Sequence, residues 1–502
     1  NHPLLNDFVF ASQFMKEIRE KFRSHLAASI ADPNREKSQP ISQKMLELHI
    51  QHPAHIPSQE ENEEANKEFS IEEITRVLKN MQNESTPGPS GTTKSFFLWL
   101  ISMIPNLFTK GLNEYLNHHT ESSAFEWIKK RKIVFIPKPG RTRNKLENYR
   151  PISLLEVYYK VIAKLLANKL GKCIHKNISK SQFGFIPTRT VSEASTYLQT
   201  IINRAKRTGE AIQIVFLDAR AAFDLTRTEA TTAMMKHLGA PDELIKKLNA
   251  LTNKGVFSIE MFGDSSIETE ILSGTGQGDP ASSDKYDATH EGNTLLYKAK
   301  KFNWSLRDGD ELVDPVSFAD DTSIPVQLQS LEDYEELLNF FDSLSAITGY
   351  AINQAKTEIL AFNTNPLLID EINNLGKGTV KTGVKHLGIW LTSAAEAMEK
   401  VNFDYLIDRM KKATTRIVRR NQCSVYTRAL LIEAILHSQT NHIIMSLKLS
   451  NDQLEKLQEI IYKALWKKKN NEDACVEGRH QIAKENTCSN QSGRIKHEKN
   501  QS

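Results

Sequence analysis

The spacing of hydrophobic residues changes along the chain and separates a polar start from a regularly patterned remainder. Residues 1–69 show no sustained hydrophobic period and end in an acidic run over residues 59–64, which predicts a loosely ordered leader. Ser70 and Glu73 then have the spacing of a helical capping box, and apolar residues follow at helical intervals up to Met81. A helix is therefore predicted from residue 71, ended by the Pro- and Gly-rich turn at 86–91.

The middle and the end of the chain have different patterns. From about residue 120 to about residue 395, short apolar runs alternate with helical patterns, which is typical of a mixed α and β domain. After about residue 395 the pattern is wholly helical, with one helix predicted over Arg428 to Leu436. A later helix presents an apolar face that comprises Leu454, Leu457, Ile460, Ile461 and Leu465. The polar residues that follow are predicted to be disordered.

Composition narrows the class of protein. The chain has 502 residues, 39% of them hydrophobic, and a net charge of +4. This charge excludes a histone-like polycation but not a nucleic-acid-binding protein, since binding depends on where Lys and Arg cluster. The sparse cysteines predict an intracellular chain without a disulfide framework. The longest apolar run, Phe96 to Phe108, is too short to span a bilayer. No secretory signal is visible. Residue 1 is Asn rather than Met, so we interpret the sequence as a fragment.

Two apolar segments end in aspartates. The run 212–217 predicts a buried strand with Asp218 at its carboxyl end, and two β-prone runs flank Asp320 and Asp321, which predicts a hairpin with a carboxylate pair at its tip. Adjacent carboxylates repel each other and lose hydration on an apolar hairpin, so a cation is expected beside them. Hard oxygen ligands favour Mg²⁺ or Mn²⁺ over zinc. Taken alone, the aspartate pair also fits an exposed surface turn.

These and several other short segments lie between roughly residues 80 and 395. In their order and spacing they resemble the motifs of the reverse transcriptases of non-LTR (LINE-type, jockey-like) retrotransposons. The palm segments that carry the resemblance are Leu217 to Asp224, Gly274 to Pro280, Phe318 to Asp321, Gly349 to Asn353 with Lys356, and His386 to Ile389. The fingers segments are Ile136 to Pro139, Asn148 to Leu155, and Ser181 to Phe185 with Arg189.

The resemblance implies an α+β fold of the right-hand polymerase type, with fingers, a palm built on an antiparallel sheet and a helical thumb. The regions expected on this basis are the leader at 1–69, an N-terminal helical extension of the fingers at 70–117, the fingers and palm at 118–393, the thumb at 394–470 and a disordered tail at 471–502.

The resemblance also implies an RNA-directed DNA polymerase that extends a DNA 3′ end on an RNA template by two-metal nucleotidyl transfer. Asp218 and Asp320 are the implied ligands of two Mg²⁺ ions, for which Mn²⁺ can substitute, and Asp321 supports them. The ions would lower the pKa of the primer hydroxyl and neutralise the triphosphate. Lys356 matches the position implied to protonate the leaving pyrophosphate.

Other matched positions imply a nucleotide-binding site. Phe223 is implied to exclude the 2′-hydroxyl of a ribonucleotide, and Lys138 and Arg150 are implied to grip the triphosphate. Gln277 and Gly278 would lie along the templating base pair. Without the resemblance, these positions fit equally well a core phenylalanine, two surface cations and a plain loop.

Basic clusters predict a track for the RNA–DNA hybrid. Two clusters, at 129–132 and 138–145, flank the fingers segments. The cluster expected on the thumb comprises Lys411, Lys412, Arg416, Arg419 and Arg420. Phosphate contacts by these side chains predict salt-sensitive binding. The expected partners are therefore an RNA template, a DNA primer, their hybrid and deoxynucleoside triphosphates, with no membrane.

The sequence departs from the family at several points. Arg220 stands where the family usually has Lys, and residues 281–292 are polar where the family often has an apolar helix. In the polar tail, Cys475, His480, Cys488 and His497 lack the spacing of a zinc knuckle. The tail residues are therefore interpreted as unrelated to metal binding.

Two alternatives to an active retrotransposon enzyme stay open at this point. One is a catalytically inactive, RNA-binding relic of the same fold, and the other is a reverse transcriptase of the group II intron maturase type. The upstream endonuclease region that elements of this type encode is expected to be absent from this chain. A nuclear or cytoplasmic location is expected, and the sequence favours neither.

Overall fold

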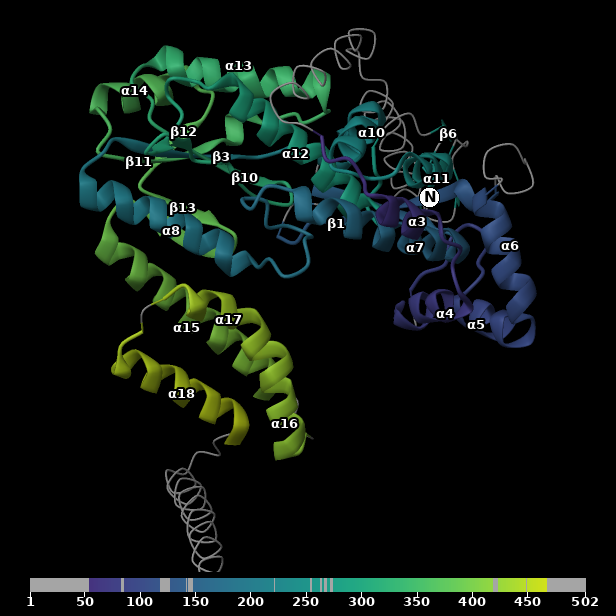
Figure 1. Ribbon diagram of the computed structural model, residues 1–502. Helices are drawn as coiled ribbons and strands as arrows, with labels where there is room; N and C mark the ends of the chain where they lie inside the picture. The colour runs from purple at the N-terminus through teal and green to yellow at the C-terminus, as the bar shows by residue number, and fades with distance from the viewer. Residues whose placement is uncertain are drawn as a thin grey trace, which may run out of the picture. The chain divides into compact units, whose positions relative to one another are not determined.

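The computed structural model describes residues 54–466, apart from 83–84, 118–126, 141, 143–147, 221, 253–254, 262–263, 266–268, 271–273, 419–422 and 448. The chain forms two compact units, one ending at Lys381 and the other beginning at Thr382 (Figure 1). Each unit is described by itself. The predicted leader lies outside the described residues up to residue 53, and the predicted tail at 471–502 lies wholly outside them.

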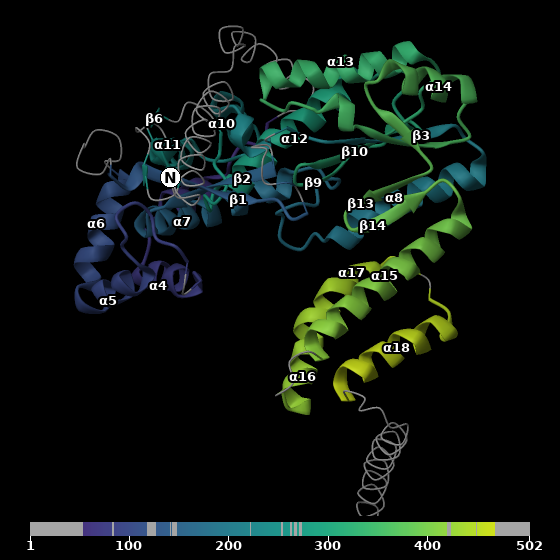
Figure 2. The same ribbon diagram turned by 180° about the vertical axis from the view of Figure 1, so that it is seen from behind.

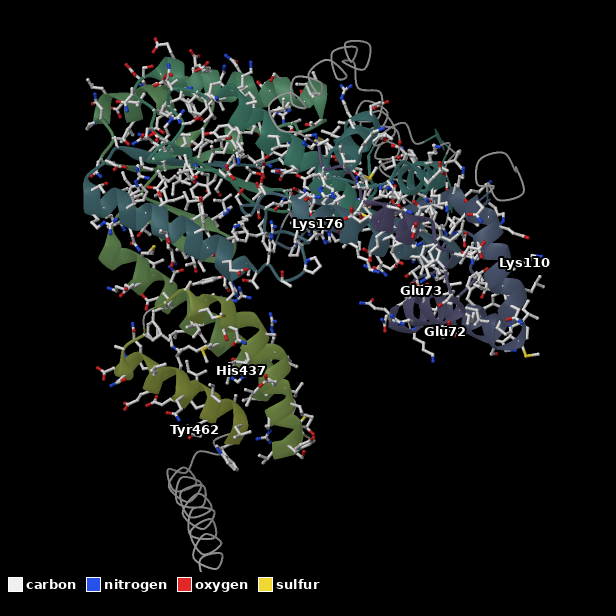
Figure 3. All side chains as sticks on the ribbon, in the orientation of Figure 1. Glu72, Glu73, Lys110, Lys176, His437 and Tyr462 are labelled. Atoms are coloured by element: carbon white, nitrogen blue, oxygen red, sulfur yellow. The ribbon has the colours of Figure 1, made fainter. Side chains whose placement is uncertain are left out.

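The first unit begins with helices that pack on a shared core. They are α3 (Gln59–Asn66), α4 (Ile71–Asn80), α5 (Lys94–Met103) and α6 (Pro105–Asn117). The predicted capping box at the start of α4 is confirmed, because Ser70 and Glu73 cap each other's backbone amides. Glu72 and Glu73 lie at this helix start (Figure 3), and Phe69, just before the cap, is buried in the core.

No single helix in the described ranges is long and apolar enough to cross a membrane. The pair α5 and α6 meets the length and composition criteria only when taken together, and the two helices are bent by 114° at their junction.

A sheet near the N-terminal helices has the strand order β2-β1-β4-β5, with β6 also paired to β4. Its strands are β1 (Lys130–Pro137), β2 (Tyr149–Leu155), β4 (Val256–Met261), β5 (Asp264–Ser265) and β6 (Thr269–Glu270). Strands β1 and β2 are antiparallel, with Ile136 opposite Arg150. Helices α7 (Val157–Ile174) and α11 (Asp242–Thr252), which lie between β2 and β4 in the sequence, pack against each other.

The central sheet of this unit has the order β12-β11-β3-β10-β9. Its strands are β3 (Ile212–Leu217), β9 (Val316–Phe318), β10 (Asp321–Val326), β11 (Glu358–Phe362) and β12 (Thr379–Lys381). Every residue of β3 is buried, and antiparallel partners flank it on both sides. The predicted buried strand at 212–217 is therefore confirmed.

Helices cover the central sheet on both faces. In both views α13 (Leu331–Ile347) and α14 (Pro366–Leu375) lie on one side of the sheet and α8 (Val191–Thr208) lies on the other (Figures 1 and 2). The remaining helices of this unit are α9 (Ala222–Leu225), α10 (Thr228–His237), α12 (Ser282–Lys300) and the 3-10 turns η4 (His175–Asn177) and η5 (Gln354–Lys356). A small ribbon of β7 (Arg307–Asp308) and β8 (Glu311–Leu312) follows α12.

The second unit begins with a hairpin of β13 (Gly383–His386) and β14 (Ile389–Thr392). The rest of its described part is helical, as predicted: α15 (Ala395–Val418), α16 (Val425–Leu431), a π-helical segment η6 (Ile432–His437), α17 (Ser438–Met445) and α18 (Asn451–Trp466). Helix α15 packs against α17 and α18. Of the predicted apolar face of α18, Leu457 and Ile460 are buried whereas Leu454 is exposed.

Candidate active site

Asp218 follows the last residue of β3, and its backbone is held on both sides. The Asn353 amide donates to the Asp218 carbonyl at 2.8 Å, and the Arg220 amide donates to the Ala351 carbonyl at 2.8 Å. The segment around Tyr350, which the sequence places in a palm motif, thus runs alongside Asp218 as a short antiparallel neighbour. The Asp218 side chain is 48% exposed, so its position is fixed while its carboxylate faces solvent.

Asp320 and Asp321 lie at the tip of the predicted hairpin, which is confirmed as β9 and β10. In the antiparallel ladder between β10 and β3, Thr322 pairs with Leu217. The next positions along the two strands are Asp321 and Asp218, so the two residues come to the same edge of the sheet. Asp320 occupies the loop one residue beyond.

The carboxylates at this edge influence one another. Burial, together with the negative charges of Asp320 and Asp218, raises the pKa of Asp321 to about 6. A site that binds no cation would be expected to spread such charges apart. The clustering therefore indicates a place where positive charge is accommodated.

Lys356 supplies one positive charge here. Its Nζ lies 3.4 Å from Asp218 Oδ2, and both side chains are largely exposed. Lys356 ends the turn η5, which follows directly on the segment that pairs with Asp218. The structure therefore brings together four of the sequence-predicted residues: Asp218, Asp320, Asp321 and Lys356.

The hairpin loop is supported from beneath. Ala319 has a φ of 57°, a left-handed conformation that favours glycine and is strained for alanine. Residues 181–183 pair in parallel with β9, since the Phe183 amide donates to the Ser317 carbonyl at 2.7 Å. Gly184 then passes so close to the loop that a Cβ there would lie 2.1 Å from the Ala319 nitrogen.

Arg189 holds this supporting segment in place. Its guanidinium donates to the carbonyls of Ser179 and Gln182 at 2.5 Å each and to that of Ile178 at 3.1 Å. The fingers motif that contains Gly184 and Arg189 thus acts structurally, as a brace for the hairpin that carries Asp320.

Phe223 lies on the short helix α9 that follows Asp218 and is half-buried. Its ring stacks on Tyr286 with centroids 4.8 Å apart and meets Phe185 edge-on at 6.0 Å. The Thr275 amide donates to the Phe223 carbonyl at 2.8 Å. The phenylalanine proposed to select the sugar is therefore packed from two sides.

The loop that contains Gln277 and Gly278 contacts β2. The Ser153 amide donates to the Gln277 carbonyl at 2.9 Å. Gly278 has a φ of 106° and lies so close to β2 that a Cβ would be 2.9 Å from the Ser153 carbonyl oxygen. Both facts require glycine at this position.

A buried ionic group anchors the same loop. Asp279 accepts a hydrogen bond from the Tyr159 hydroxyl at 2.5 Å and lies 3.8 Å from the Arg131 guanidinium. The Arg131 and Asp279 side chains are almost wholly buried. The prediction that the cluster at 129–132 contacts phosphates is therefore wrong for Arg131, whose buried partner Asp279 lies far along the chain.

Lys138 and Arg150 lie at the same end of the β1–β2 hairpin. Arg150 is opposite Ile136 in the ladder, and the Lys138 amide donates to the Asn148 carbonyl at 2.7 Å. The Arg150 side chain is exposed and that of Lys138 is half-buried. The pairing of β1 with β2 thus brings together the two cations that the motifs assign to the triphosphate.

The polar segment after Pro280 forms helix α12, and most of this helix is buried. Its polar side chains bond to distant parts of the first unit. Glu291 accepts from the Ser179 hydroxyl at 2.5 Å, His290 contacts Thr322 at 3.0 Å, and Asn293 accepts from Thr348 at 2.8 Å. The polar composition therefore reflects a buried hydrogen-bonded helix behind the carboxylate hairpin.

The thumb cations lie on the second unit. Lys411, Lys412 and Arg416 are exposed on α15, and Lys412 also pairs with Asp408 at 2.6 Å. Arg419 and Arg420 lie outside the described residues, as do Cys475, His480, Cys488 and His497.

The carboxylates at this sheet edge are oxygen donors of the kind that Mg²⁺ takes. Within the described ranges, no group of three or more His, Cys, Asp or Glu side chains is gathered closely enough to hold a metal ion on its own. Mg²⁺, however, is usually bound through one or two carboxylates together with water and substrate phosphates. The solvent-facing Asp218 beside the aspartate hairpin is an oxygen donor set of that kind.

Comparison with known families decides the wider assignment. The model of the reverse transcriptase (RNA-dependent DNA polymerase) family matches residues 136–391, just over half of the chain. The chain belongs to the reverse transcriptase family. The matched range includes the aspartates, Lys356, Phe223 and the glycine loop, and the right-hand polymerase fold predicted from the motifs is confirmed.

Curated relatives place this reverse transcriptase among those of non-LTR retrotransposons, as the motifs indicate. It is 22% identical over 82% of its length to the transposon TX1 uncharacterized 149 kDa protein of Xenopus laevis, covering 31% of that protein. It is 24% identical over 58% of its length to the RNA-directed DNA polymerase from mobile element jockey of Drosophila melanogaster, covering 32% of it. The chain thus spans about a third of these relatives.

Solved structures of telomerase are also similar to this reverse transcriptase. The telomerase from Candida albicans in complex with a fragment of telomeric RNA has a TM-score of 0.42 at 13% identity, over 76% of this chain and 70% of that one. Apo telomerase from Candida tropicalis has a TM-score of 0.38 at 11% identity, over 53% of this chain and 54% of that one.

Proposed function

We propose that this reverse transcriptase extends a DNA 3′ end on an RNA template by adding deoxynucleotides. The observation that carries the proposal is the meeting of Asp218 with Asp320 and Asp321 at one sheet edge, where their charges act on one another. In this reaction the primer 3′ hydroxyl gives up its proton to water, its oxygen bonds to the α-phosphorus, and the bond from that phosphorus to pyrophosphate breaks. Positioning and electrostatic stabilisation carry most of the rate of such transfers.

Asp218 and Asp320 are the proposed ligands of two Mg²⁺ ions, with Asp321 in support, and Mn²⁺ is a substitute. When bound, the ions supply charge stabilisation at the attacking and leaving oxygens. Asp321 lies at the same sheet edge as Asp218, and an adjacent cation would favour the charged form of its carboxylate. Lys356 lies next to Asp218, and its ammonium group donates the proton that the leaving pyrophosphate takes up.

The nucleotide is held by residues from three elements. Lys138 and Arg150, at the end of the β1–β2 hairpin, bind the triphosphate. Phe223 presents its ring to C2′ of the sugar and excludes a 2′-hydroxyl. The backbone of Gln277 and Gly278 lies along the templating base pair, where the missing side chain of Gly278 permits a close approach.

The RNA–DNA hybrid is bound through its phosphates. Lys411, Lys412 and Arg416 present exposed positive charge on α15, and Arg419 and Arg420 extend this series in the sequence. Recognition of an A-form hybrid by shape requires no base-specific contact. Binding should therefore weaken steeply with salt.

Primer extension tests the proposal. The purified chain is incubated with poly(rA), oligo(dT), dTTP and Mg²⁺, beside a sample that contains a chelator. Extension that depends on the metal is the expected result. A folded chain that binds the hybrid but never extends the primer would instead be the inactive relic.

A further inference from the structure

The ring of Phe223 is held by neighbours more than by its own helix. Helix α9 has only four residues, too few to be a rigid support by itself. Tyr286 stacks on the Phe223 ring at 4.8 Å with an interplanar angle of 29°, and Phe185 meets it edge-on at 6.0 Å. The face of the Phe223 ring is thus set largely by the ring of Tyr286.

Tyr286 has the properties of a fixed support. It lies in the first half of α12 with 3% of its surface exposed. Its hydroxyl has no hydrogen-bond partner among the described residues. A buried tyrosine usually forms a hydrogen bond through its hydroxyl, but Tyr286 forms none in the described part of the chain. The interaction that its ring makes with Phe223 is therefore the stronger reason for an aromatic residue at this position.

The same support continues to the carboxylate hairpin. The Tyr286 ring lies 5.8 Å from that of His290, one helical turn further along α12. His290 in turn contacts the Thr322 hydroxyl at 3.0 Å, one residue beyond Asp321. Tyr286 and His290 therefore connect the ring proposed to select the sugar with the strand that carries the aspartates.

We propose that Tyr286 is a positioning residue for sugar selection, which acts by holding the Phe223 ring at the depth where it excludes a 2′-hydroxyl. This inference rests on the proposed function of Phe223. It assigns a role to a helix position that lies outside the aspartate, glycine and lysine motifs.

The test compares three tyrosine substitutions with Phe223→Val, which removes the selecting ring itself. Tyr286→Leu removes the flat support and should lower the preference for dTTP over UTP by about 3- to 10-fold, the range expected for loss of one stacked aromatic pair. Tyr286→Phe keeps the ring and should leave the preference unchanged. Tyr297→Leu is the matched control, because Tyr297 is a buried tyrosine of the same helix that packs on Phe302, Trp304 and Phe340 instead.

Two readouts are used. The first is the ratio of kcat/KM for dTTP and UTP in extension on poly(rA). The second is the equilibrium binding of dTTP and UTP to the complex with a dideoxy-terminated oligo(dT), which needs no turnover. Loss of selectivity in Tyr286→Leu alone, by either readout, supports the inference.

The outcomes separate this inference from the proposed function. If Phe223→Val loses selectivity while Tyr286→Leu keeps it, the positioning role of Tyr286 is wrong and the role of Phe223 stands. If Tyr286→Leu and Tyr297→Leu lose the preference for dTTP over UTP equally, the cause is a general loss of stability, and the inference is again overturned. A wild-type complex that binds neither nucleotide overturns both.

Discussion

Gly184 lies in direct contact with Ala319, the first residue of the loop that carries Asp320. A Cβ at Gly184 would lie 2.1 Å from the Ala319 nitrogen and 2.9 Å from its Cα. Both atoms belong to the backbone, so no side-chain rotation can relieve the clash. The distance between a fingers motif and the aspartate hairpin is therefore fixed by the absence of a side chain.

Gly184→Ala should lower the rate of primer extension by about 100-fold, because a shift of about 1 Å at a reacting group has effects of that size. Hybrid binding should be retained. Gly111→Ala is the control, since a Cβ at Gly111 meets nothing within 4 Å. A Gly184→Ala enzyme with wild-type kcat would show that the hairpin tolerates displacement.

Lys356→Met and Lys356→Arg separate two roles of the lysine beside Asp218. A general acid typically contributes about 100-fold or more to the rate, and Arg keeps the charge but does not release a proton near neutral pH. Both variants should therefore lose about 100-fold in kcat, with a stability change of less than about 1 kcal/mol because the pair is exposed. If Lys356→Arg keeps the wild-type kcat while Lys356→Met loses it, Lys356 acts through its charge and not as a proton donor.

Arg131→Met should destabilise the first unit by about 3–5 kcal/mol, since it removes the guanidinium that pairs with the buried Asp279 carboxylate. Urea unfolding measures the loss. In the double variant Arg131→Met with Asp279→Asn, part of the stability should return because the uncompensated charge is gone. Strictly additive losses in this double-mutant cycle would contradict an ionic anchor for the glycine loop.

Asp287 gives the first unit a pH dependence. Burial raises the pKa of Asp287 well above its usual value, and the carboxylates of Asp284 and Glu291 add to this while Arg189 opposes it. The folded chain therefore holds a proton that the unfolded chain releases above about pH 4. The contribution of Asp287 to the free energy of unfolding is fully present below that pH. It is lost as the pH rises through the pKa of Asp287 in the folded state.

Asp287→Asn should remove this loss, because neither carboxylate oxygen of Asp287 has a hydrogen-bond partner in the described part of the chain. The variant should gain about 1–3 kcal/mol over the wild type at pH 8 and less at pH 5. Asp370→Asn on α14 is the control, since Asp370 is exposed and is not among the charges that shift the pKa of Asp287. An equal effect of Asp287→Asn at both pH values would show that Asp287 is ionised in the folded state.

Local signals in the sequence predict the parts of the site that lie on single elements. Five apolar residues among the six at 212–217 predict the buried strand before Asp218, and β-prone runs around Asp320 predict its hairpin. Ser70 and Glu73 likewise predict the start of α4, because a capping box is a local signal formed by residues three apart.

Contacts between distant segments are beyond such signals. Residues 281–292 are polar where the resemblance implies an apolar helix, yet α12 is buried because Ser179, Thr322 and Thr348 supply hydrogen-bond partners for its side chains. The roles of Gly184 and Tyr286 likewise depend on Ala319 and Phe223. The i, i+4 spacing of Tyr286 and His290 was the signal available in the sequence, and it does not identify their neighbours.

The measurement that tests the central claim most directly is single-nucleotide extension of oligo(dT) on poly(rA) by the wild type and by Asp320→Asn, in Mg²⁺, at enzyme concentrations that saturate the hybrid. Asp320→Asn changes one ligand atom and keeps the shape of the side chain. The account predicts extension by the wild type, loss of at least about 1,000-fold in the variant, and equal hybrid binding by both. Extension by Asp320→Asn at the wild-type rate would contradict it.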